Sequence, residues 1–365
     1  MKVILAINSL HGGGAERVMA WLAGRLCAAG HTVTLITFEG PDTDAYRCPQ
    51  SVERVHIGRY RYFNSSRISA FVNLMRWGHG LRRSIRSAQA DVVLSFVDGM
   101  NVYCLFSLLG VRVPIVVAER TDPSHSLMSM NKKRARPFLY RFKANAVVFQ
   151  TDLVASKFKA LWSLNRVVTI PNAVQADILD QFNDNPQNIV LAVGRLDFQK
   201  GQDILLKAWE KIGRLKDGWT LRLVGDGVAR EVYEVMISEM GISDSVVLAG
   251  ATNNVALEYE RASIFVLPSR VEGFPNVLLE AMSAGKAVIA SNIPDACREV
   301  VTNGVDGILY DGESVDELVS ALEILLGSPS LRANLAFKAK RVNSRFSEDA
   351  VYEKWESCLF DASHK

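Results

Sequence analysis

The chain has 365 residues, of which 48% are apolar and 22% charged, with 25 glycines and 11 prolines. This length exceeds what one ordinary hydrophobic core supports, so two domains are expected, and the composition excludes a disordered or collagen-like chain. The net charge is +3, yet residues 1–185 hold 23 lysines and arginines against 13 acidic residues, and the remainder hold 19 against 26. This asymmetry predicts different tasks for the two halves.

The cysteines and the apolar runs of the sequence indicate where in the cell the protein is located. Cys27, Cys48, Cys104, Cys297 and Cys358 are scattered and never in C-x-x-C spacing, which indicates reduced, mostly buried thiols in a cytosolic protein rather than disulfides or structural zinc. The first ten residues carry one lysine and a short apolar run, which predicts a first strand rather than a signal peptide. No uninterrupted run of 18 apolar residues occurs, so we expect any membrane contact to be peripheral.

Short β-branched runs alternate with longer helical patterns along nearly the whole chain, which is typical of parallel sheets with crossover helices. A first set of strands is predicted at 2–7, 32–38, 91–96, 115–119, 146–151 and 167–171. A second set is predicted at 189–193, 220–224, 246–250, 264–268, 287–291 and 307–310. We therefore expect an α/β fold of two tandem Rossmann-like domains, with ligands at the carboxyl ends of the strands in an interdomain cleft.

A polar stretch rich in Asn, Asp and Gln separates the two sets of strands. It predicts an N-terminal Rossmann-like domain over residues 1–172, a linker over 173–188 and a C-terminal Rossmann-like domain over 189–340. Residues 341–365 carry apolar side chains loosely at helical spacing, so we expect a closing C-terminal helix that can return to the N-terminal domain.

The most informative segment begins Glu-Gly-Phe-Pro-Asn at residue 272, just after a predicted strand. Pro275 suits the first turn of a helix, and Gly285 suits the position just past its end. Such a helix start directs the backbone N–H groups near Asn276 and Val277 toward the edge of the sheet, where they favour a phosphate.

Two carboxylates, Glu272 and Glu280, accompany this helix start. Carboxylates are poor phosphate ligands but accept hydrogen bonds from sugar hydroxyls. Two glutamates eight residues apart would by themselves more often form a solvated helix face. The intervening Gly-Phe-Pro-Asn favours a ligand site instead.

A second candidate is the loop Gly-Arg-Leu-Asp-Phe-Gln-Lys-Gly after the first strand of the second domain. Arg195 can fork across two oxygens, and Lys200 can act as a point charge. A cation about 4 Å from a phosphate oxygen contributes roughly 4 kcal/mol at an effective dielectric constant of 20, against about 0.3–2 kcal/mol for a helix terminus. If the loop binds a diphosphate, these two cations should contribute more to its stabilisation than the helix terminus does. Either cation alone would more often be solvated.

The third candidate is the glycine turn after the first strand, which contains Gly13 and Gly14. A dinucleotide fingerprint needs a third glycine where Arg17 stands, so a nicotinamide site is weakened. Glu39, at the end of the second strand, is nevertheless the residue that such a site would use for the ribose. The oxidoreductase alternative therefore stays open.

Together these motifs, with Val-Gly-Asp-Gly at 224–227, resemble the retaining glycosyltransferases of family 4, which have the GT-B fold. The resemblance implies an acceptor held by the N-terminal domain and a nucleotide sugar, expected to be a UDP-sugar, held by the C-terminal one. It implies catalytic roles for Arg195, Lys200 and Glu272. The implied donor-binding residues are Gly13, Gly14, Arg195, Lys200, Glu272, Gly273, Phe274, Pro275, Asn276, Val277 and Glu280.

On the acceptor side the chain departs from the family. Many relatives carry an active-site histidine after the fourth strand, where this chain reads Glu-Arg-Thr-Asp-Pro. Glu119, Arg120 and the nearby His125 are the candidates there, although a lone loop histidine is more often structural. Asp42 and Asp44 spell a D-x-D motif without partner ligands, so we expect them at the surface and expect no catalytic metal. We also expect no cofactor, since the UDP-sugar is a substrate.

Two basic clusters interleaved with apolar residues predict peripheral contact with an anionic membrane rather than nucleic-acid binding. They comprise Arg59, Arg61, Arg67, Arg76, Arg82, Arg83 and Arg86, then Lys132, Lys133, Arg134, Arg136, Arg141 and Lys143. A solvated face is the simpler interpretation of such clusters.

The sequence thus predicts a metal-independent retaining glycosyltransferase on the inner face of the cytoplasmic membrane. It would move a hexose or N-acetylhexosamine from a UDP-sugar to a lipid-linked or polysaccharide acceptor, as in lipopolysaccharide, O-antigen or exopolysaccharide synthesis. A nucleotide-sugar epimerase of the same fold, a nicotinamide-dependent oxidoreductase and a non-enzymatic adaptor for nucleic acid or membrane are the alternatives.

Overall fold

The computed structural model describes residues 1–58, 67–126, 128–174, 186–293 and 295–364. It divides into two compact units. Unit 1 comprises Met1–Asn172 together with Val351–Lys365, and unit 2 comprises Ala173–Ala350. Most of the predicted linker lies outside the described residues.

Unit 1 is built on a seven-stranded parallel sheet in the order β3-β2-β1-β4-β5-β6-β7. The strands are β1 (Lys2–Ile7), β2 (Thr32–Thr37), β3 (Glu53–His56), β4 (Val92–Phe96), β5 (Ile115–Ala118), β6 (Ala146–Phe149) and β7 (Val167–Thr169). The central strands are apolar and buried along nearly their whole length, as in a sheet covered on both faces. The chain order reverses between β1 and β4, which makes that point the topological switch of the sheet.

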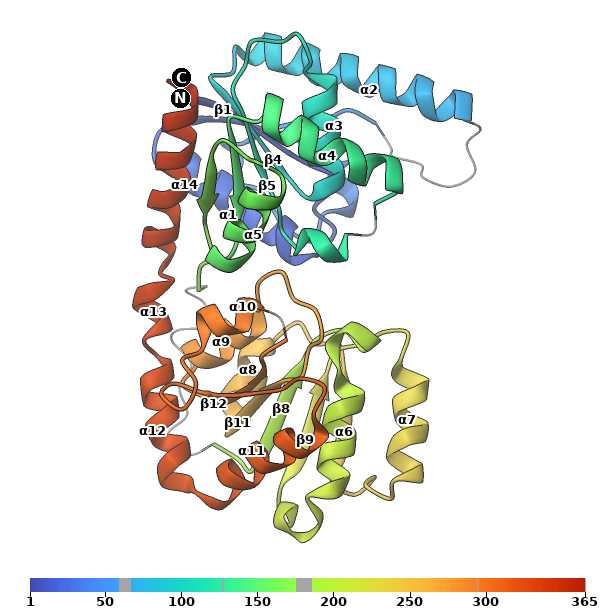
Figure 1. Ribbon diagram of the computed structural model, residues 1–365, viewed down its shortest axis with the longest axis vertical. Coiled ribbons are helices and arrows are strands. Elements are labelled where there is room, and N and C mark those ends of the chain that lie inside the picture. The colour runs from blue at the N-terminus through green and yellow to red at the C-terminus, as the bar shows by residue number, and fades with distance from the viewer. Residues whose placement is uncertain (59–66, 127, 175–185, 294, 365) are drawn as a thin grey trace. The chain divides into compact units, whose positions relative to one another are not determined.

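Helices cover both faces of this sheet (Figure 1). They are α1 (Gly14–Ala28), α2 (Arg67–Ala88), α3 (Asp98–Ser107), α4 (Met130–Lys143) and α5 (Asp152–Leu161), with 3-10 turns η1 (Pro41–Thr43) and η2 (Pro123–His125). The last helix, α14 (Glu348–Ser363), belongs to unit 1 from Val351 onward. Its Trp355 is fully buried against Phe96 of β4, with ring centroids 5.4 Å apart.

Unit 2 is built on a six-stranded parallel sheet in the order β10-β9-β8-β11-β12-β13. The strands are β8 (Ile189–Val193), β9 (Thr220–Val224), β10 (Val246–Gly250), β11 (Ile264–Leu267), β12 (Ala287–Ser291) and β13 (Ile308–Tyr310). The helices are α6 (Gln202–Lys211), α7 (Arg230–Glu239), α8 (Val255–Arg261), α9 (Asn276–Ser283), α10 (Asp295–Val300), α11 (Val315–Gly327), α12 (Pro329–Ala339) and α13 (Val342–Arg345), with 3-10 turns η4 (Phe198–Lys200) and η5 (Gly213–Lys216).

All predicted strands are present, with ends within two residues of the prediction, and the tandem Rossmann-like fold is confirmed. The prediction missed β3, whose sequence Glu-Arg-Val-His lacks an apolar run because it is an edge strand and only half-buried. The predicted domain boundary at 340/341 differs from the observed one at 350/351. The reason is that α13 packs on α9, and Phe346 packs on Phe274, so this stretch stays with unit 2.

Candidate functional site

Loops from neighbouring strands of unit 2 meet backbone to backbone at the carboxyl edge of its sheet. Gly201, with φ +66°, is so close to the loop after β11 that an added Cβ would lie 2.0 Å from the Pro268 carbonyl oxygen. Gly225, with φ +138°, would place a Cβ 2.0 Å from the Gly194 carbonyl oxygen. Only glycine permits these approaches. The loops that follow β8, β9 and β11 therefore hold one another in place.

Lys200 and Glu272 form an ion pair across two of these loops. The Lys200 Nζ lies 2.7 Å from Glu272 Oε1, and the Ser269 hydroxyl donates to the same oxygen at 2.7 Å. The Glu272 side chain is only 9% exposed, so its carboxylate faces its partners rather than bulk solvent. An ammonium has three donors, so the bond to Glu272 leaves two for a ligand.

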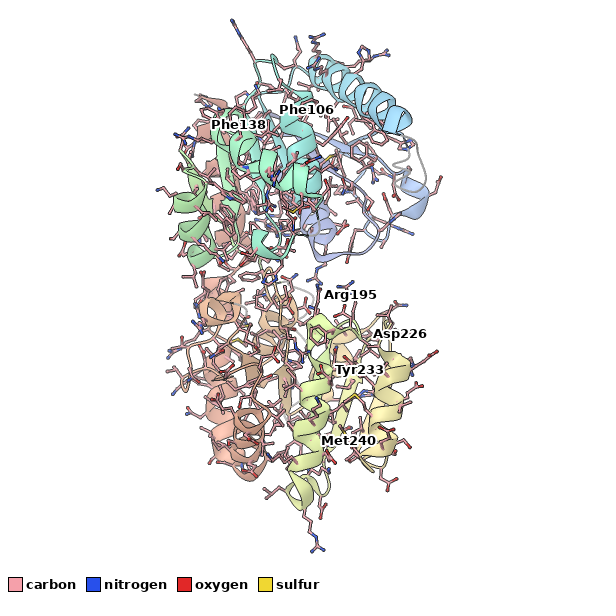
Figure 2. The ribbon with its side chains drawn as sticks, turned by 45° about the vertical axis from the view of Figure 1, so that its right-hand side comes forward. Phe106, Phe138, Arg195, Asp226, Tyr233 and Met240 are labelled. Atoms are coloured by element: carbon pink, nitrogen blue, oxygen red, sulfur yellow. The ribbon has the colours of Figure 1, made fainter. Side chains whose placement is uncertain are left out.

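Arg195 is the exposed cation of this edge. Its side chain is 72% exposed, and its Nη2 lies 3.2 Å from Asp197 Oδ2. Asp197 also caps η4 by accepting from the Lys200 backbone N–H at 3.1 Å. Figure 2 shows Arg195 and Asp226 at the same end of unit 2, with Met240 at the opposite end. The two predicted cations therefore project from one short loop, and Asp197 contacts the Arg195 guanidinium and the Lys200 backbone.

Helix α9 begins at Asn276, directly after Pro275. Phe274 is buried and packs on Phe346, with ring centroids 5.9 Å apart, which fixes the direction from which the chain enters the helix. Glu280 is buried, and its Oε2 accepts from the Tyr259 hydroxyl at 3.0 Å. The structure thus places Glu272 before the helix and Glu280 within it, while their predicted contacts with a sugar stay predictions.

Cys297 of α10 lies beneath the ion pair and was not singled out from sequence. Burial, reinforced by the negative charge of Glu272 and opposed by Lys200, raises the pKa of this thiol well above its ordinary value. Cys297 therefore stays protonated and acts as an apolar residue of the core. The described cysteines are all free thiols, with Cys104 and Cys358 also buried.

In unit 1 the glycine turn leads directly into α1. Gly13 is the N-cap and Gly14 the first helical residue. A Cβ at Gly13 would meet the Glu16 carboxylate at 2.2 Å. Glu39, the residue that a nicotinamide site would use for the ribose, is instead 2.8 Å from His11 Nε2.

The acceptor-side candidates have contrasting environments. Glu119 is 1% exposed and accepts from the Tyr140 hydroxyl, whereas His125 is exposed in η2. Burial raises the pKa of Glu119 to about 7; Arg136 and Tyr140 oppose this shift, and Asp98 adds to it. Glu119 therefore exchanges its proton near neutral pH.

Arg120 is also buried. Its guanidinium donates to Asn172 Oδ1 and lies 4.7 Å from the centroid of the Phe96 ring. Burial lowers the pKa of Arg120 to about 9, so it stays cationic at neutral pH. In this structure Glu119 and Arg120 lie beneath the surface and form hydrogen bonds with neighbouring side chains.

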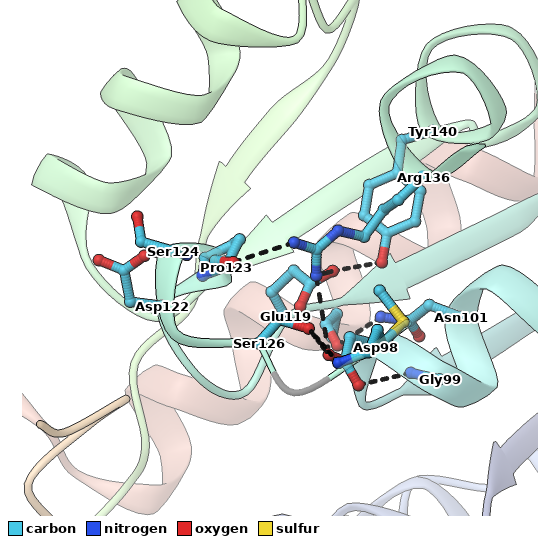
Figure 3. Close-up of polar contacts among 12 residues, drawn as sticks. Asp98, Gly99, Asn101, Glu119, Asp122, Pro123, Ser124, Ser126, Arg136 and Tyr140 are labelled. Atoms are coloured by element: carbon cyan, nitrogen blue, oxygen red, sulfur yellow. Dashed lines mark hydrogen bonds and ion pairs between the residues drawn. The ribbon is translucent and has the colours of Figure 1, made fainter. Parts of the chain in front are cut away.

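The structure corrects the assignment of Arg136 to a surface basic cluster. Its side chain is 3% exposed and lies between Asp98 and Glu119 (Figure 3). Asp98 was not among the residues predicted for the site, and Arg136 was predicted only as part of a basic surface. Asp98 could have been found, because it follows the buried strand β4 by two residues at the switch point of the sheet.

The rest of the basic clusters is described in part. Arg59 and Arg61 lie outside the described residues, as do the side chains of Arg67 and Arg76. Arg82 donates to the Ser107 carbonyl at 2.6 Å and so fastens α2 to the end of α3. In the second cluster Lys132, Lys133, Arg134, Arg141 and Lys143 are exposed or half-buried.

Among the described residues, no three His, Cys, Asp or Glu side chains are arranged to hold a metal ion. The predicted surface motif Asp42-Thr43-Asp44 is only partly at the surface, because Asp44 is mostly buried and paired with Arg54 of β3. Within the same described ranges, no helix has the length and apolarity needed to cross a membrane.

Two family models match the chain. Residues 12–178 match "Glycosyltransferase Family 4", and residues 175–342 match "Glycosyl transferases group 1". A Campylobacter jejuni α-1,4-N-acetyl-D-galactosaminyltransferase, whose substrate is named as an undecaprenol-linked glycan, is 27% identical and covers 97% of each chain. An uncharacterized glycosyltransferase from Methanocaldococcus jannaschii is 31% identical, over 89% of this chain and 86% of its own. The structure of Anabaena HepE in complex with UDP superposes with a TM-score of 0.85 at 18% identity, covering 99% of this chain and 100% of that one.

Proposed function

Because this chain belongs to the GT-B glycosyltransferases of the family 4 type, we propose that it transfers a hexose or N-acetylhexosamine from a UDP-sugar to a lipid-linked or polysaccharide acceptor, with retention and without a catalytic metal. The observation that carries this proposal is the edge of unit 2. There Arg195 and Lys200 project from one loop, and Glu272 is fixed beside Lys200 at 2.7 Å. This arrangement suits a sugar diphosphate, which combines an anion with hydroxyl donors.

In the proposed reaction, the bond between the anomeric carbon and the diphosphate oxygen breaks, and UDP leaves. Arg195, Lys200 and the start of α9 stabilise the charge that develops on the diphosphate. Glu272 orients the sugar ring through its hydroxyls. The acceptor hydroxyl attacks the same face of the ring, and its proton passes to an oxygen of the departing diphosphate.

Relatives support the choice of donor and acceptor. Anabaena HepE binds UDP, and the Campylobacter enzyme acts on a glycan attached to undecaprenol diphosphate. On this basis we propose UDP as the nucleotide, held mainly by unit 2, and an acceptor held by unit 1. The pathway would be the assembly of a surface polysaccharide, such as lipopolysaccharide, O-antigen or exopolysaccharide.

The proposed acceptor calls for peripheral attachment to the inner face of the cytoplasmic membrane, and α4 offers a suitable surface. Phe138 and Phe142 are 64% and 66% exposed, and their ring centroids are 4.7 Å apart. Arg134 and Arg141 are exposed on the same helix, and the Arg141 guanidinium lies 5.3 Å from the centroid of the Phe142 ring. Figure 2 shows Phe138 on the same side of unit 1 as Phe106, which is also exposed. Exposed aromatic rings among cations suit an anionic bilayer surface.

Product analysis tests the proposed reaction. The full chain is incubated with a panel of UDP-sugars and alkyl glycosides as acceptor mimics, with and without EDTA, and the anomeric configuration of each product is read by proton NMR. We expect an α-linked product from an α-linked donor, at a rate that EDTA leaves unchanged. An inverted product, or activity that EDTA abolishes and Mg²⁺ restores, would contradict the proposal. Conversion of the donor without any acceptor would indicate an epimerase.

Vesicle binding tests the membrane surface separately. Replacing Phe138 and Phe142 together with serine should lower binding to phosphatidylglycerol vesicles at least about tenfold, because two exposed rings no longer enter the interface. Binding to phosphatidylcholine vesicles should be weak for both proteins. Phe337→Ser is the control, since Phe337 is 75% exposed, more than either ring of the pair, but lies on α12 of unit 2. Equal binding by wild type and the double variant would exclude this surface.

A further inference from the structure

Two carboxylates at the carboxyl edge of the unit 1 sheet share one guanidinium. Arg136 Nη1 lies 3.5 Å from Glu119 Oε1 and 3.8 Å from Asp98 Oδ2 (Figure 3). The exposed fractions of the side chains are 1% for Glu119, 3% for Arg136 and 18% for Asp98. Within the described part of the chain, Glu119 Oε2 and Arg136 Nε have no hydrogen-bond partner although both are buried. Such unsatisfied groups are costly and call for an explanation.

The backbone that presents Asp98 is strained. Val97, between β4 and α3, has φ +73°, a conformation that β-branched residues rarely adopt. Strain of this kind persists where the surrounding structure enforces it, often at ligand sites. Asp98 also follows β4, which pairs with β1 at the switch point, and ligands of open α/β sheets bind outside the carboxyl ends of strands at that point.

Resting on the proposed function, we infer that the Asp98 carboxylate binds a hydroxyl group of the acceptor sugar in unit 1. Oδ1 accepts from the Gly99 N–H at 2.6 Å, and Oδ2 accepts from the Ser126 hydroxyl. Each carboxylate oxygen can accept about two hydrogen bonds, so further donors can be bound at both. The Asp98 carboxylate accepts hydrogen bonds and carries negative charge, which favours a neutral hydroxyl donor and disfavours a phosphate.

Glu119 and Arg136 are positioning residues in this scheme. Arg136 Nη2 donates to the Pro123 carbonyl at 3.1 Å and so fastens the loop that carries Ser126. Ser126 in turn holds Asp98. Tyr140 donates to Glu119 and holds it beneath Arg136, where the Glu119 carboxyl shares the guanidinium with Asp98. The buried layer therefore fixes both the loop and the carboxylate that faces the ligand.

Asp98→Asn tests the inference, with Asp91→Asn as the control. Asp91 precedes β4 at the opposite edge of the same sheet, and its carboxylate accepts from the Lys2 backbone N–H at 2.7 Å. The first probes are octyl glycosides of glucose, galactose and N-acetylgalactosamine, and their binding to the full chain is measured by saturation-transfer NMR. The second probe is UDP, whose binding is measured by calorimetry. We expect at least one glycoside to bind wild type and Asp91→Asn alike but Asp98→Asn at least about tenfold more weakly, because an amide presents one acceptor oxygen instead of two.

UDP affinity should be the same in all three proteins. Ser126→Ala, which keeps the carboxylate but removes the hydroxyl that positions it, should weaken glycoside binding a few-fold. A glycoside lacking the contacted hydroxyl should show no difference between wild type and Asp98→Asn. Equal glycoside binding by wild type and Asp98→Asn, or no glycoside binding by wild type, would overturn the inference. Failure of wild type to bind any UDP-sugar or UDP would instead refute the proposed function.

Discussion

The charged side chains at the carboxyl edges of the two sheets differ in how they are paired and how deeply they are buried. In unit 2 two acids are each paired with one cation, Glu272 with Lys200 and Asp197 with Arg195, and Arg195 is largely exposed. In unit 1 Asp98 and Glu119 share the single guanidinium of Arg136, and the pair is mostly buried. In unit 2 the exposed Arg195 can exchange its partner at little cost, whereas in unit 1 buried groups hold Asp98 and Arg136 in place.

This difference shows how two domains of the same fold can bind an anionic diphosphate in one case and neutral hydroxyl groups in the other. An exposed guanidinium with one acidic contact can turn to a diphosphate without leaving a buried charge unpaired. A buried acidic pair with one cation repels an anion but accepts hydrogen bonds from hydroxyls. We therefore expect changes in unit 2 to alter UDP affinity and turnover, and changes in unit 1 to alter acceptor affinity and pH dependence.

The largest effect is expected from removing the charge of Lys200. Lys200→Gln keeps a donor for Glu272 but loses the cation, and kcat/KM for the UDP-sugar should fall about a hundredfold, equivalent to about 2.7 kcal/mol. The control is Lys207→Met, which removes an exposed cation from the following helix α6. Steady-state kinetics with varied donor checks the prediction, and a fall of less than about threefold would remove Lys200 from the site.

The next effect concerns the packing of the loops in unit 2. Gly201→Ala and Gly213→Ala both place a Cβ at positive φ, +66° and +62°, but only the first meets backbone, at 2.0 Å. We expect a loss of unfolding free energy of about 1 kcal/mol at Gly213 and about 2–4 kcal/mol at Gly201. Urea unfolding measures both. Equal losses of unfolding free energy in the two variants would show that the loops move apart at little cost and do not hold one another in place.

The smallest effect is a change in pH dependence in unit 1. Since the pKa of Glu119 is raised from 4.5 to about 7, the folded chain holds this proton over a range where the unfolded chain releases it. Its contribution to the free energy of unfolding therefore falls as pH rises from about 4.5 to about 7 and levels off above that. The groups that face it are Arg136, Tyr140, Asp98 and Asn101.

Glu119→Gln should remove this dependence, so its melting temperature relative to wild type should be higher at about pH 8 than at about pH 5. Glu239→Gln, on the exposed end of α7, should track wild type at both values. A difference between wild type and Glu119→Gln that does not vary with pH would mean that the carboxyl is ionised throughout.

Much of the fold was predictable because buried parallel strands are continuous apolar runs with glycines and prolines at their ends. Lys200 and Glu272 could be proposed as partners in one site because turn residues bracket each of them. Their direct pairing could not, since it depends on two loops 72 residues apart. Arg136 was misassigned because a run of lysines and arginines looks solvated, although Arg136, Leu139 and Tyr140 lie on the inward face of α4. A sequence pattern does not show which cation of such a run meets a buried acid.

The return of α14 to unit 1 has a consequence for biosynthesis. Trp355 is fully buried against Phe96, so the core of unit 1 cannot close until the segment from Val351 onward has left the ribosome. Unit 2 is one uninterrupted stretch and can fold earlier during translation, although N-terminal domains usually fold first. A nascent chain that stops short of Val351 would present an unfinished unit 1 to chaperones and proteases, with Phe96 lacking the ring that covers it.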